Sequence, residues 1–211
     1  MKPTRVRILD AADQLMRTVG LARTTTKEIA RVAGCSEAAL YKHFDSKEEL
    51  FTFVLRERLP RLAPLLAELE SGGAAGQGHD VGETLAEIAR HAVAFYASTF
   101  PIAASLFSDP ALLRRHGEEM DRLDMGPHKP LDALAAYLRE QRAAGRLRAG
   151  ADPEAAAALF LGACFQRAFL EAFSGDRPPP GPAARPIDEF AAALAGTLLE
   201  GVGEPGAFAR P

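Results

Sequence analysis

Residues that favour β-strands and disulfide bridges are scarce in this chain of 211 residues. Alanine and leucine dominate, β-branched residues are sparse, and no segment alternates polar and apolar residues with a period of two. Both features argue against a sheet and predict an all-α fold. The two cysteines, Cys35 and Cys164, are too few for a small disulfide scaffold and lack the spacing of metal ligands.

Segments that would direct the chain into or across a membrane are also lacking. The longest apolar run, residues 155–165, is too short to cross a bilayer and is typical of a buried helix. The N-terminus is charged throughout and does not resemble a signal peptide. We therefore expect a soluble cytoplasmic protein with no membrane partner.

Motifs that carry catalysis are absent as well. The sequence contains no glycine-rich phosphate loop, nucleophile elbow, metal motif or clustered pair of carboxylates. Cys164 lies inside the apolar run, where a thiol is inert. His91, His116 and His128 lack the i, i+3 or i+4 pairing of helical metal ligands. Because these motifs are absent, we expect a protein that is not an enzyme and that binds no cofactor or metal.

Charge is distributed unevenly along the chain, although its net value of -3 is small. Residues 1–59 contain 11 Lys and Arg against 8 Asp and Glu, whereas the remainder contains 14 against 20. A basic head on an acidic body suits a protein that binds DNA through its N-terminal part.

The most informative segment is residues 25–50, TTKEIARVAGCSEAALYKHFDSKEEL. Thr25 and Ser46 each precede a glutamate by three residues, which is the pattern of a capping box at a helix start. Gly34 lies where the first helix must end and turn, and Ser36 can cap the next helix. The segment therefore predicts a helix-turn-helix, whose second helix enters the major groove of DNA.

Apolar periodicity extends this motif to a three-helix unit over residues 4–44, followed by a further helix. The predicted core positions are Ile8, Ala12, Leu15, Val19, Ile29, Val32, Ala33, Leu40 and Phe44. This pattern leaves Glu37, Ala38, Lys42 and His43 on the outer side of the second helix of the motif, which we expect over residues 36–43.

At these positions the chain resembles the TetR family of transcriptional regulators, over about its first 55 residues. The matching elements are RILDAADQLM, Gly20, Thr24-Thr25, Glu28-Ile29-Ala30, Ala33-Gly34, Ser36, Leu40-Tyr41, Phe44, Ser46-Lys47-Glu48 and Leu50. The sequence departs from the family pattern at Thr26 in place of an aliphatic residue, at Cys35 in place of Val or Ile, and at Glu37-Ala38 in place of a basic residue or Pro followed by Gly. These departures affect which operator sequence the protein would recognise.

DNA contacts are predicted along the motif. Lys42 can donate to guanine or to a phosphate, Glu37 can accept from cytosine N4, and Ala38 can meet a thymine methyl group. Thr25 lies at a helix N-terminus, where phosphates bind, and the resemblance implies a phosphate contact for Lys47. Arg5 and Arg23 are secondary candidates. The predicted DNA-binding set is Thr25, Ser36, Glu37, Ala38, Tyr41, Lys42, His43 and Lys47; the alternative is that these side chains are simply solvated.

Beyond the motif, helix-start and helix-stop signals predict about nine helices in total. Three regions are expected: a DNA-binding head (1–46), a connecting helix (47–70) and a helical effector-binding and dimerisation body (71–211). Prolines at 60, 64 and 101 should kink or interrupt the helices, and 71–78 and 177–186 should be loops.

A homodimer is predicted from the last two helices. The helix over residues 153–173 is apolar almost all round and must bury two faces, and the helix over 187–200 has an apolar edge of its own. The resemblance implies that these helices pair across a two-fold axis as a four-helix bundle. Two recognition helices about 34 Å apart would then read a palindromic operator in double-stranded DNA.

The resemblance also implies a pocket in the body for a small hydrophobic or amphipathic effector that releases a repressor from its operator. The candidate lining residues are Phe95, Tyr96, Phe100, Phe107, Met120, Tyr137, Phe165, Gln166 and Phe169. Two alternatives stay open: these aromatic residues are plain core, or the protein is an architectural or adaptor DNA-binding protein without an effector.

Overall fold

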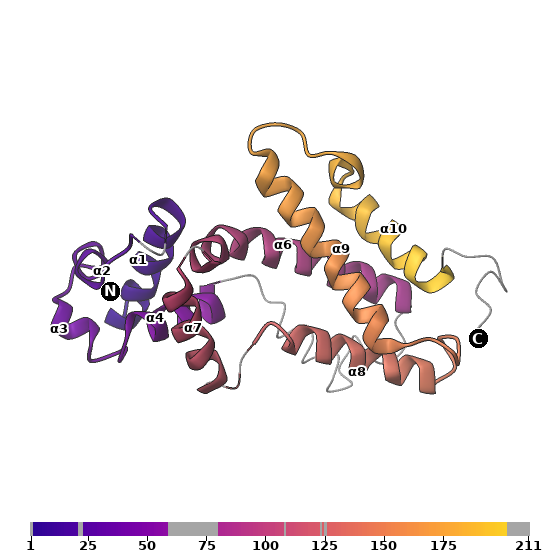
Figure 1. Ribbon diagram of the computed structural model, residues 1–211, viewed down its shortest axis with the longest axis horizontal. Coiled ribbons are helices and arrows are strands. Elements are labelled where there is room, and N and C mark those ends of the chain that lie inside the picture. Colours follow the sequence, from indigo (N-terminus) through magenta and orange to yellow (C-terminus); the bar gives the residue numbers. More distant parts are fainter. Residues whose placement is uncertain are drawn as a thin grey trace. The chain divides into compact units, whose positions relative to one another are not determined.

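All regular structure in the described part of the chain is helical. The computed structural model describes residues 2–20, 23–58, 80–107, 109–122, 124 and 126–201. Within these ranges it contains nine α-helices, one short 3-10 helix and no strand (Figure 1). The predicted all-α class and helix number are thus confirmed. The predicted interruptions at residues 60 and 64, the predicted loop at 71–78 and the end of the predicted connecting helix lie outside the described residues.

The chain divides into two compact units. The first comprises Met1–Pro60 and Ser98–Gly126, and the second Arg61–Ala97 and Pro127–Pro211. The α-helices are α1 (Thr4–Thr18), α2 (Thr26–Ala33), α3 (Glu37–Leu40), α4 (Lys47–Arg58), α6 (Val81–Phe107), α7 (Pro110–Arg122), α8 (Lys129–Ala143), α9 (Pro153–Ser174) and α10 (Ile187–Glu200), and the 3-10 helix η1 is Gly181–Ala184.

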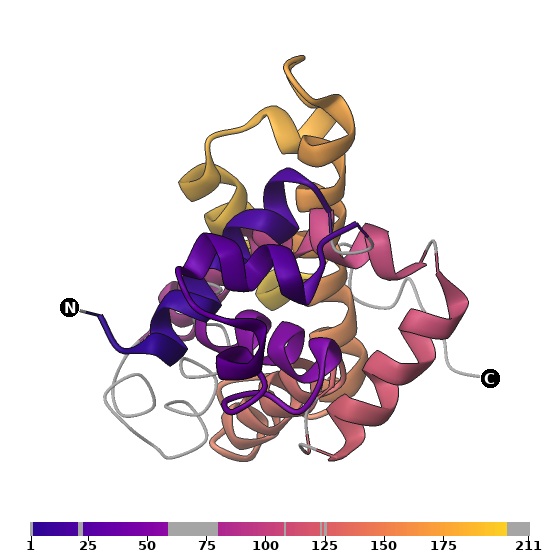
Figure 2. The ribbon, with the colours of Figure 1, turned by 90° about the vertical axis from the view of Figure 1, so that its left-hand side faces the viewer.

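The first unit contains the helix-turn-helix (Figure 2). The predicted side-chain caps are present at the starts of α2 and α3. The Thr25 hydroxyl accepts a hydrogen bond from the Glu28 N–H over 3.2 Å, and the Ser36 hydroxyl accepts from Ala39 over 3.1 Å. Between the two helices, Gly34 adopts a φ of 66°, and its N–H bonds back to the carbonyls that end α2. A residue with a side chain would be strained in this left-handed conformation, so glycine shapes the turn.

Two details of the head differ from the sequence prediction. The second helix of the motif covers only residues 37–40, because the His43 N–H bonds to Leu40 three residues back and the chain tightens into turns toward α4. Val32 was expected in the core but is 38% exposed, because only one narrow face of the short α2 packs inward.

The core of the first unit draws on residues far apart in the sequence. Ile8, Leu9, Ile29, Leu40 and Phe51 from the first four helices are almost fully buried together with Phe44, which lies between α3 and α4. Leu106 at the end of α6 and Leu112 on α7 belong to the same cluster. The Asp109 carboxylate caps α7 by accepting from Ala111 and Leu112, both over 3.0 Å. Helix α7 therefore packs with the helix-turn-helix in one unit.

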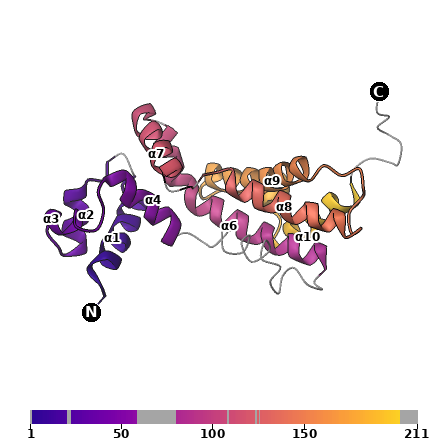
Figure 3. The same ribbon diagram turned by 90° about the horizontal axis from the view of Figure 1, so that it is seen from below.

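The second unit is a helical bundle made by the first part of α6 with α8, α9 and α10 (Figure 3). Its core includes Leu85, Ile88, Leu134, Phe160 and Ala191, each fully buried. A kink or an interruption was predicted at position 101; helix α6 continues through this position, so the chain is not interrupted there. A proline removes one hydrogen bond, and the remaining bonds of a 27-residue helix outweigh that loss.

Helix α9 leaves much of its apolar surface uncovered in the single chain. An 18-residue window of this 22-residue helix has a mean hydropathy of 1.3, and only 33% of the window is buried. By length and composition alone it could cross a membrane, a test that core helices also pass. Leu159 and Phe173 are 72% and 73% exposed. The helix thus has one face in the core and another open.

Candidate nucleic-acid interface and effector site

The predicted DNA-contacting residues lie at the start of α2, on α3 and in the turns that follow. Thr25, Ser36, Ala38, Lys42 and His43 are all exposed. Tyr41 is also exposed, at 48%. Leu40, between them in sequence, is fully buried and anchors α3 to the core. The fold therefore leaves these side chains exposed around the helix-turn-helix.

Glu37 is tied to a second helix, which the sequence did not predict. The Thr26 hydroxyl, in the first turn of α2, donates to the Glu37 carboxylate over 2.5 Å. The Tyr41 hydroxyl in turn donates to the Thr26 hydroxyl oxygen over 3.4 Å. A signal was present in the sequence, because Thr26 and Glu37 are both departures from the family pattern, but their contact depends on how α2 and α3 cross.

Arg7 makes a second contact within the motif that the sequence did not predict. Its guanidinium donates to the Gly34 carbonyl over 2.8 Å, from α1 to the turn of the motif. The Arg7 Nε is buried and has no hydrogen-bond partner among the described residues. Arg7 thus fixes the turn that sets the angle between α2 and α3.

The remaining basic candidates differ in their surroundings. Lys47 is half-buried in the first turn of α4, and burial lowers the pKa of its ammonium group, an effect that nearby Arg115 reinforces. Arg5 instead pairs with Glu57 over 2.7 Å, and its guanidinium lies over the rings of Phe44 and Phe53. Arg5 is therefore engaged within the unit, in a clamp between α1 and α4.

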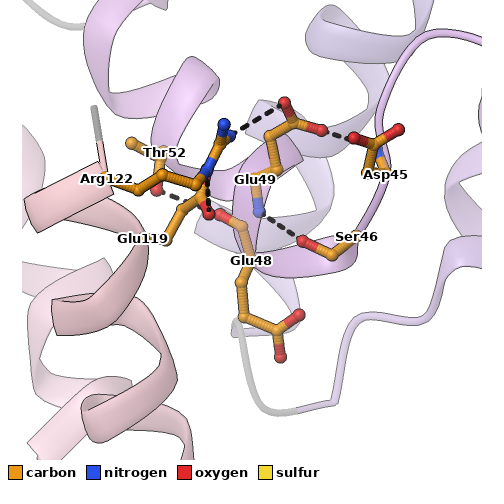
Figure 4. A network of polar contacts seen from close by, with 7 residues as sticks. All are labelled: Asp45, Ser46, Glu48, Glu49, Thr52, Glu119 and Arg122. Atoms are coloured by element: carbon orange, nitrogen blue, oxygen red, sulfur yellow. Dashed lines mark hydrogen bonds and ion pairs between the residues drawn. The ribbon is translucent and has the colours of Figure 1, made fainter.

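Helix α7 contacts α4 through a network of polar side chains (Figure 4). Arg122 lies 3.4 Å from Glu49 and 2.6 Å from Glu119. The same Glu49 is part of the predicted capping box: its N–H donates to Ser46 over 2.9 Å, while its carboxylate accepts from the Asp45 N–H. The start of α4, which holds Lys47, is thus linked directly to α7.

His116 lies beside this network on the inner side of α7. Its ring is 5.0 Å from that of Phe51, and its side chain is buried, with Nδ1 lacking a partner among the described residues. Burial lowers the pKa of the imidazole, and Glu119 opposes that effect. His116 is therefore part of the α4–α7 contact. Among the described residues it belongs to no group of potential metal ligands.

Three of the predicted effector-site residues come together in the second unit. The rings of Tyr96 and Phe165 meet edge to face with centroids 5.4 Å apart, and Phe95 lies 5.5 Å from Tyr96. Burial raises the pKa of Tyr96 to about 12, so its phenol stays neutral and can donate a hydrogen bond. Phe169, one turn after Phe165, stacks on Phe173 at 5.8 Å. This aromatic group joins α6 and α9.

The other predicted lining residues lie elsewhere. Tyr137 is buried in the core of the second unit, and that burial raises its pKa. Phe107 is 74% exposed at the end of α6, and Phe100, Phe107 and Met120 all belong to the first unit. Gln166 lines a separate groove. The aromatic group above is therefore the part of the predicted set that the fold brings together.

The groove that contains Gln166 lies between α9, η1 and α10 and has a volume of about 310 Å³. Arg167 forms its base: it is 7% exposed, pairs with Glu171 over 2.9 Å and lies 4.8 Å from the centre of the Phe190 ring. It also donates to the Arg185 carbonyl over 3.0 Å. Arg167 thereby holds the segment after α9, predicted as a plain loop, against that helix.

Within the described ranges, no group of three or more His, Cys, Asp or Glu side chains could hold a metal ion. Cys164 is fully buried on α9, and burial raises the pKa of its thiol to about 12. A thiol with such a pKa is almost entirely protonated at neutral pH and is a poor nucleophile.

Family comparisons cover both units. Residues 8–53 match the family model for bacterial regulatory proteins of the tetR family, and residues 83–199 match that for the C-terminal domain of AefR-like transcriptional repressors. The second match alone spans more than half of the chain.

Among individual proteins, the HTH-type transcriptional regulator YvkB of Bacillus subtilis is 29% identical over 84% of this chain and 87% of its own length. The nucleoid occlusion factor SlmA of Marinobacter nauticus is 30% identical over 81% of this chain and 82% of its own length. The solved FadR of Bacillus subtilis, in complex with stearoyl-CoA, is 17% identical with a TM-score of 0.65, covering 94% of this chain and 99% of its own. This last likeness concerns the fold alone.

Proposed function

Because the chain belongs to the TetR family of bacterial transcriptional regulators, we propose that it is a cytoplasmic repressor that occupies a palindromic operator until an effector releases it. The observation that carries the proposal is the capped helix-turn-helix, whose glycine turn is followed by exposed Ala38 on α3 and by exposed Tyr41 and Lys42 in the turn after it. An α-helix presented in this way fits the major groove.

In this proposal the predicted DNA contacts have distinct roles. Lys42 and Glu37 face base edges, and Ala38 can lie against a thymine methyl group. The exposed Thr25 at the start of α2 and the half-buried Lys47 at the start of α4 contact phosphates. Ser36, Tyr41 and His43 complete the contact surface.

A two-fold dimer would cover the open face of α9. Exposed Ala155, Leu159, Gly162, Gln166 and Phe173 follow one another at intervals of three, four or seven residues on α9. On α10, exposed Ala192 and Ala193 and the half-buried Gly196 form a narrow face of small residues. A Cβ atom added at Gly162 or Gly196 would meet nothing within 4 Å in the single chain, so both helices have room for close approach by a second copy. An isologous contact of this kind supplies the symmetry of a palindromic operator.

The effector would bind beside Phe95, Tyr96, Phe165 and Phe169. Their rings supply apolar contact area, and the phenol of Tyr96 is neutral. Such a lining suits a hydrophobic or amphipathic small molecule, and the stearoyl-CoA complex of Bacillus subtilis FadR is an example of an amphipathic ligand in this fold. The effector shifts the protein away from the operator-bound state only by its difference in affinity for the two states.

A second candidate function is DNA binding without any effector. The observation in its favour is the 30% identity to a nucleoid occlusion factor across four-fifths of the chain. In this alternative the aromatic group of the second unit is core and binds no ligand. Ligand-dependent release from DNA separates the two functions.

The proposal is tested by selecting bound duplexes from a randomised library with the purified protein. The expected product is a palindrome with half-site centres about one helical turn apart, or a multiple of it. Lys42→Ala should change the enriched bases within each half-site. A selection that enriches nothing, or a motif without two-fold symmetry, contradicts the proposed operator.

A further inference from the structure

The hydrogen bond between Thr26 and Glu37 joins the two helices that define the DNA-reading surface. Thr26 is the first residue of α2, and Glu37 is the first residue of α3. The 2.5 Å contact between the Thr26 hydroxyl and the Glu37 Oε1 occupies one carboxylate oxygen. The other oxygen, Oε2, is left for a donor from outside this pair.

A third residue, Tyr41, extends this contact. The direction of the first bond is set by the Glu37 carboxylate, which only accepts, so the Thr26 proton goes to Glu37. The Thr26 Oγ1 remains an acceptor and receives the Tyr41 hydroxyl proton over 3.4 Å. Donation therefore runs from Tyr41 through Thr26 to the Glu37 carboxylate, which is held by a defined partner on a neighbouring helix.

A carboxylate on this surface has few favourable partners on DNA. Ionised Glu only accepts hydrogen bonds, and phosphate oxygens also only accept, so Glu37 gains nothing from the DNA backbone. The donors in the major groove are the amino groups of cytosine and adenine. Adenine presents its N7 acceptor beside that amino group, and a carboxylate is repelled by it. Cytosine N4 is therefore the best partner.

The same chemistry excludes other bases. Guanine presents O6 and N7 and thymine presents O4, all of which are acceptors. A carboxylate held opposite them loses its hydration without gaining a donor, which costs binding energy. A carboxylate free to rotate would swing into solvent and avoid this cost, so the exclusion depends on how firmly Glu37 is held.

Building on the proposed function, we infer that Thr26 is a positioning residue for operator specificity: its hydroxyl holds the Glu37 carboxylate so that Oε2 accepts from cytosine N4 and rejects guanine and thymine. Each half-site of the operator then contains a cytosine opposite Glu37. Thr26 and Glu37, which both depart from the family pattern, thus act together in this chain to select one base.

The test compares base frequencies selected from a randomised duplex library by four proteins: wild type, Glu37→Gln, Thr26→Val and Thr18→Val. Thr26→Val replaces the hydroxyl with a methyl group of similar size. Thr18→Val is the matched control, since the Thr18 hydroxyl bonds only to the Gln14 carbonyl of its own helix, over 2.8 Å. Thermal unfolding of each variant establishes that it is folded.

The wild type should prefer cytosine over guanine by about tenfold at one position of each half-site. Glu37→Gln should abolish that preference, because its amide both donates and accepts. Thr26→Val should reduce it at the same position by at least about threefold and leave the other positions unchanged, and Thr18→Val should match the wild type.

Two results would overturn the inference. One is a Thr26→Val variant that binds all duplexes more weakly but selects the same bases, which would make the hydrogen bond purely structural. The other is a wild-type motif with no cytosine preference at any position that Glu37→Gln alters. In both results the wild type still selects an operator, so the proposed function survives; a wild type that enriches nothing removes both.

Discussion

The Arg115 guanidinium donates to the Glu48 carboxylate over 3.0 Å and joins α7 to the first turn of α4. Leu112, on the same helix, is 5% exposed and packed in the core of the first unit. An ion pair with α4 and apolar burial in the core therefore both hold α7 within this unit. Their strengths differ, since exposed ion pairs contribute little to stability whereas buried leucines contribute much.

Leu112→Ala should lower the free energy of unfolding by about 2–5 kcal/mol, because it removes buried apolar volume and leaves a cavity. Arg115→Ala should lower it by less than about 1 kcal/mol, because the ion pair is solvent-exposed. Urea unfolding of both variants measures the two values. Equal losses, or a larger loss for Arg115→Ala, would contradict the apolar contact as the main connection.

Stability of the first unit should fall in mild acid because of His116. Burial lowers the pKa of its imidazole in the folded state, so the unfolded chain binds the proton more readily. The contribution of His116 to the free energy of unfolding is complete above the unfolded pKa of about 6.5. It is lost as pH falls through the lower pKa of the folded state.

His116→Leu should therefore flatten the decline in unfolding free energy between pH 7 and pH 5. His43→Leu, at an exposed histidine of the same unit, should keep the wild-type slope. Urea titrations at three pH values provide the comparison. The same decline in wild type and His116→Leu would show that other groups cause it.

Lys47→Ala should weaken binding to every duplex and reduce the salt slope of log K by about one unit, because one phosphate contact and its released counterion are lost. Lys129→Ala, on α8 of the second unit, removes the same charge far along the chain from the motif and should keep the wild-type slope. Titrations at several salt concentrations measure both slopes. Identical slopes for the wild type and Lys47→Ala would remove this lysine from the interface.

Leu159→Lys should dissociate the proposed dimer, because a charge would be buried in an apolar contact on α9. Phe107→Lys places the same charge at a position of similar exposure in the first unit and should leave the dimer intact. Sedimentation velocity reports the oligomeric state of each. A monomeric wild type, or a dimeric Leu159→Lys variant, would refute the α9 interface.

Local signals predicted most of the fold. Capping residues such as Thr25, Ser36 and Asp152 act on backbone groups two or three residues away, so sequence alone locates the helix starts. The continuity of α6 was harder to predict, because a proline at position 101 suggests a kink or an interruption, whereas the long helix continues through it. The length of α3 depends on the following turns, which tertiary packing decides.

Contacts between residues far apart in the chain could not be predicted from the sequence. Nothing local to Thr26 indicates that its hydroxyl faces Glu37, and nothing near Gly34 indicates that Arg7 holds its carbonyl. For the effector site, the resemblance implied a pocket with aromatic lining residues, but the sequence could not separate Tyr137, which is core, from Tyr96 and Phe165, which meet. Helical periodicity places a side chain on a face but does not identify what lies opposite.

The central claim, sequence-specific operator binding by this helix-turn-helix, is tested most directly by fluorescence anisotropy. The purified protein is titrated onto a duplex from its own upstream intergenic region and onto a scrambled duplex, each at two salt concentrations. Tight binding that persists at physiological salt and favours the native duplex is the predicted result. Equal, weak and strongly salt-dependent binding to both duplexes would contradict it, because such binding reports phosphate contacts alone.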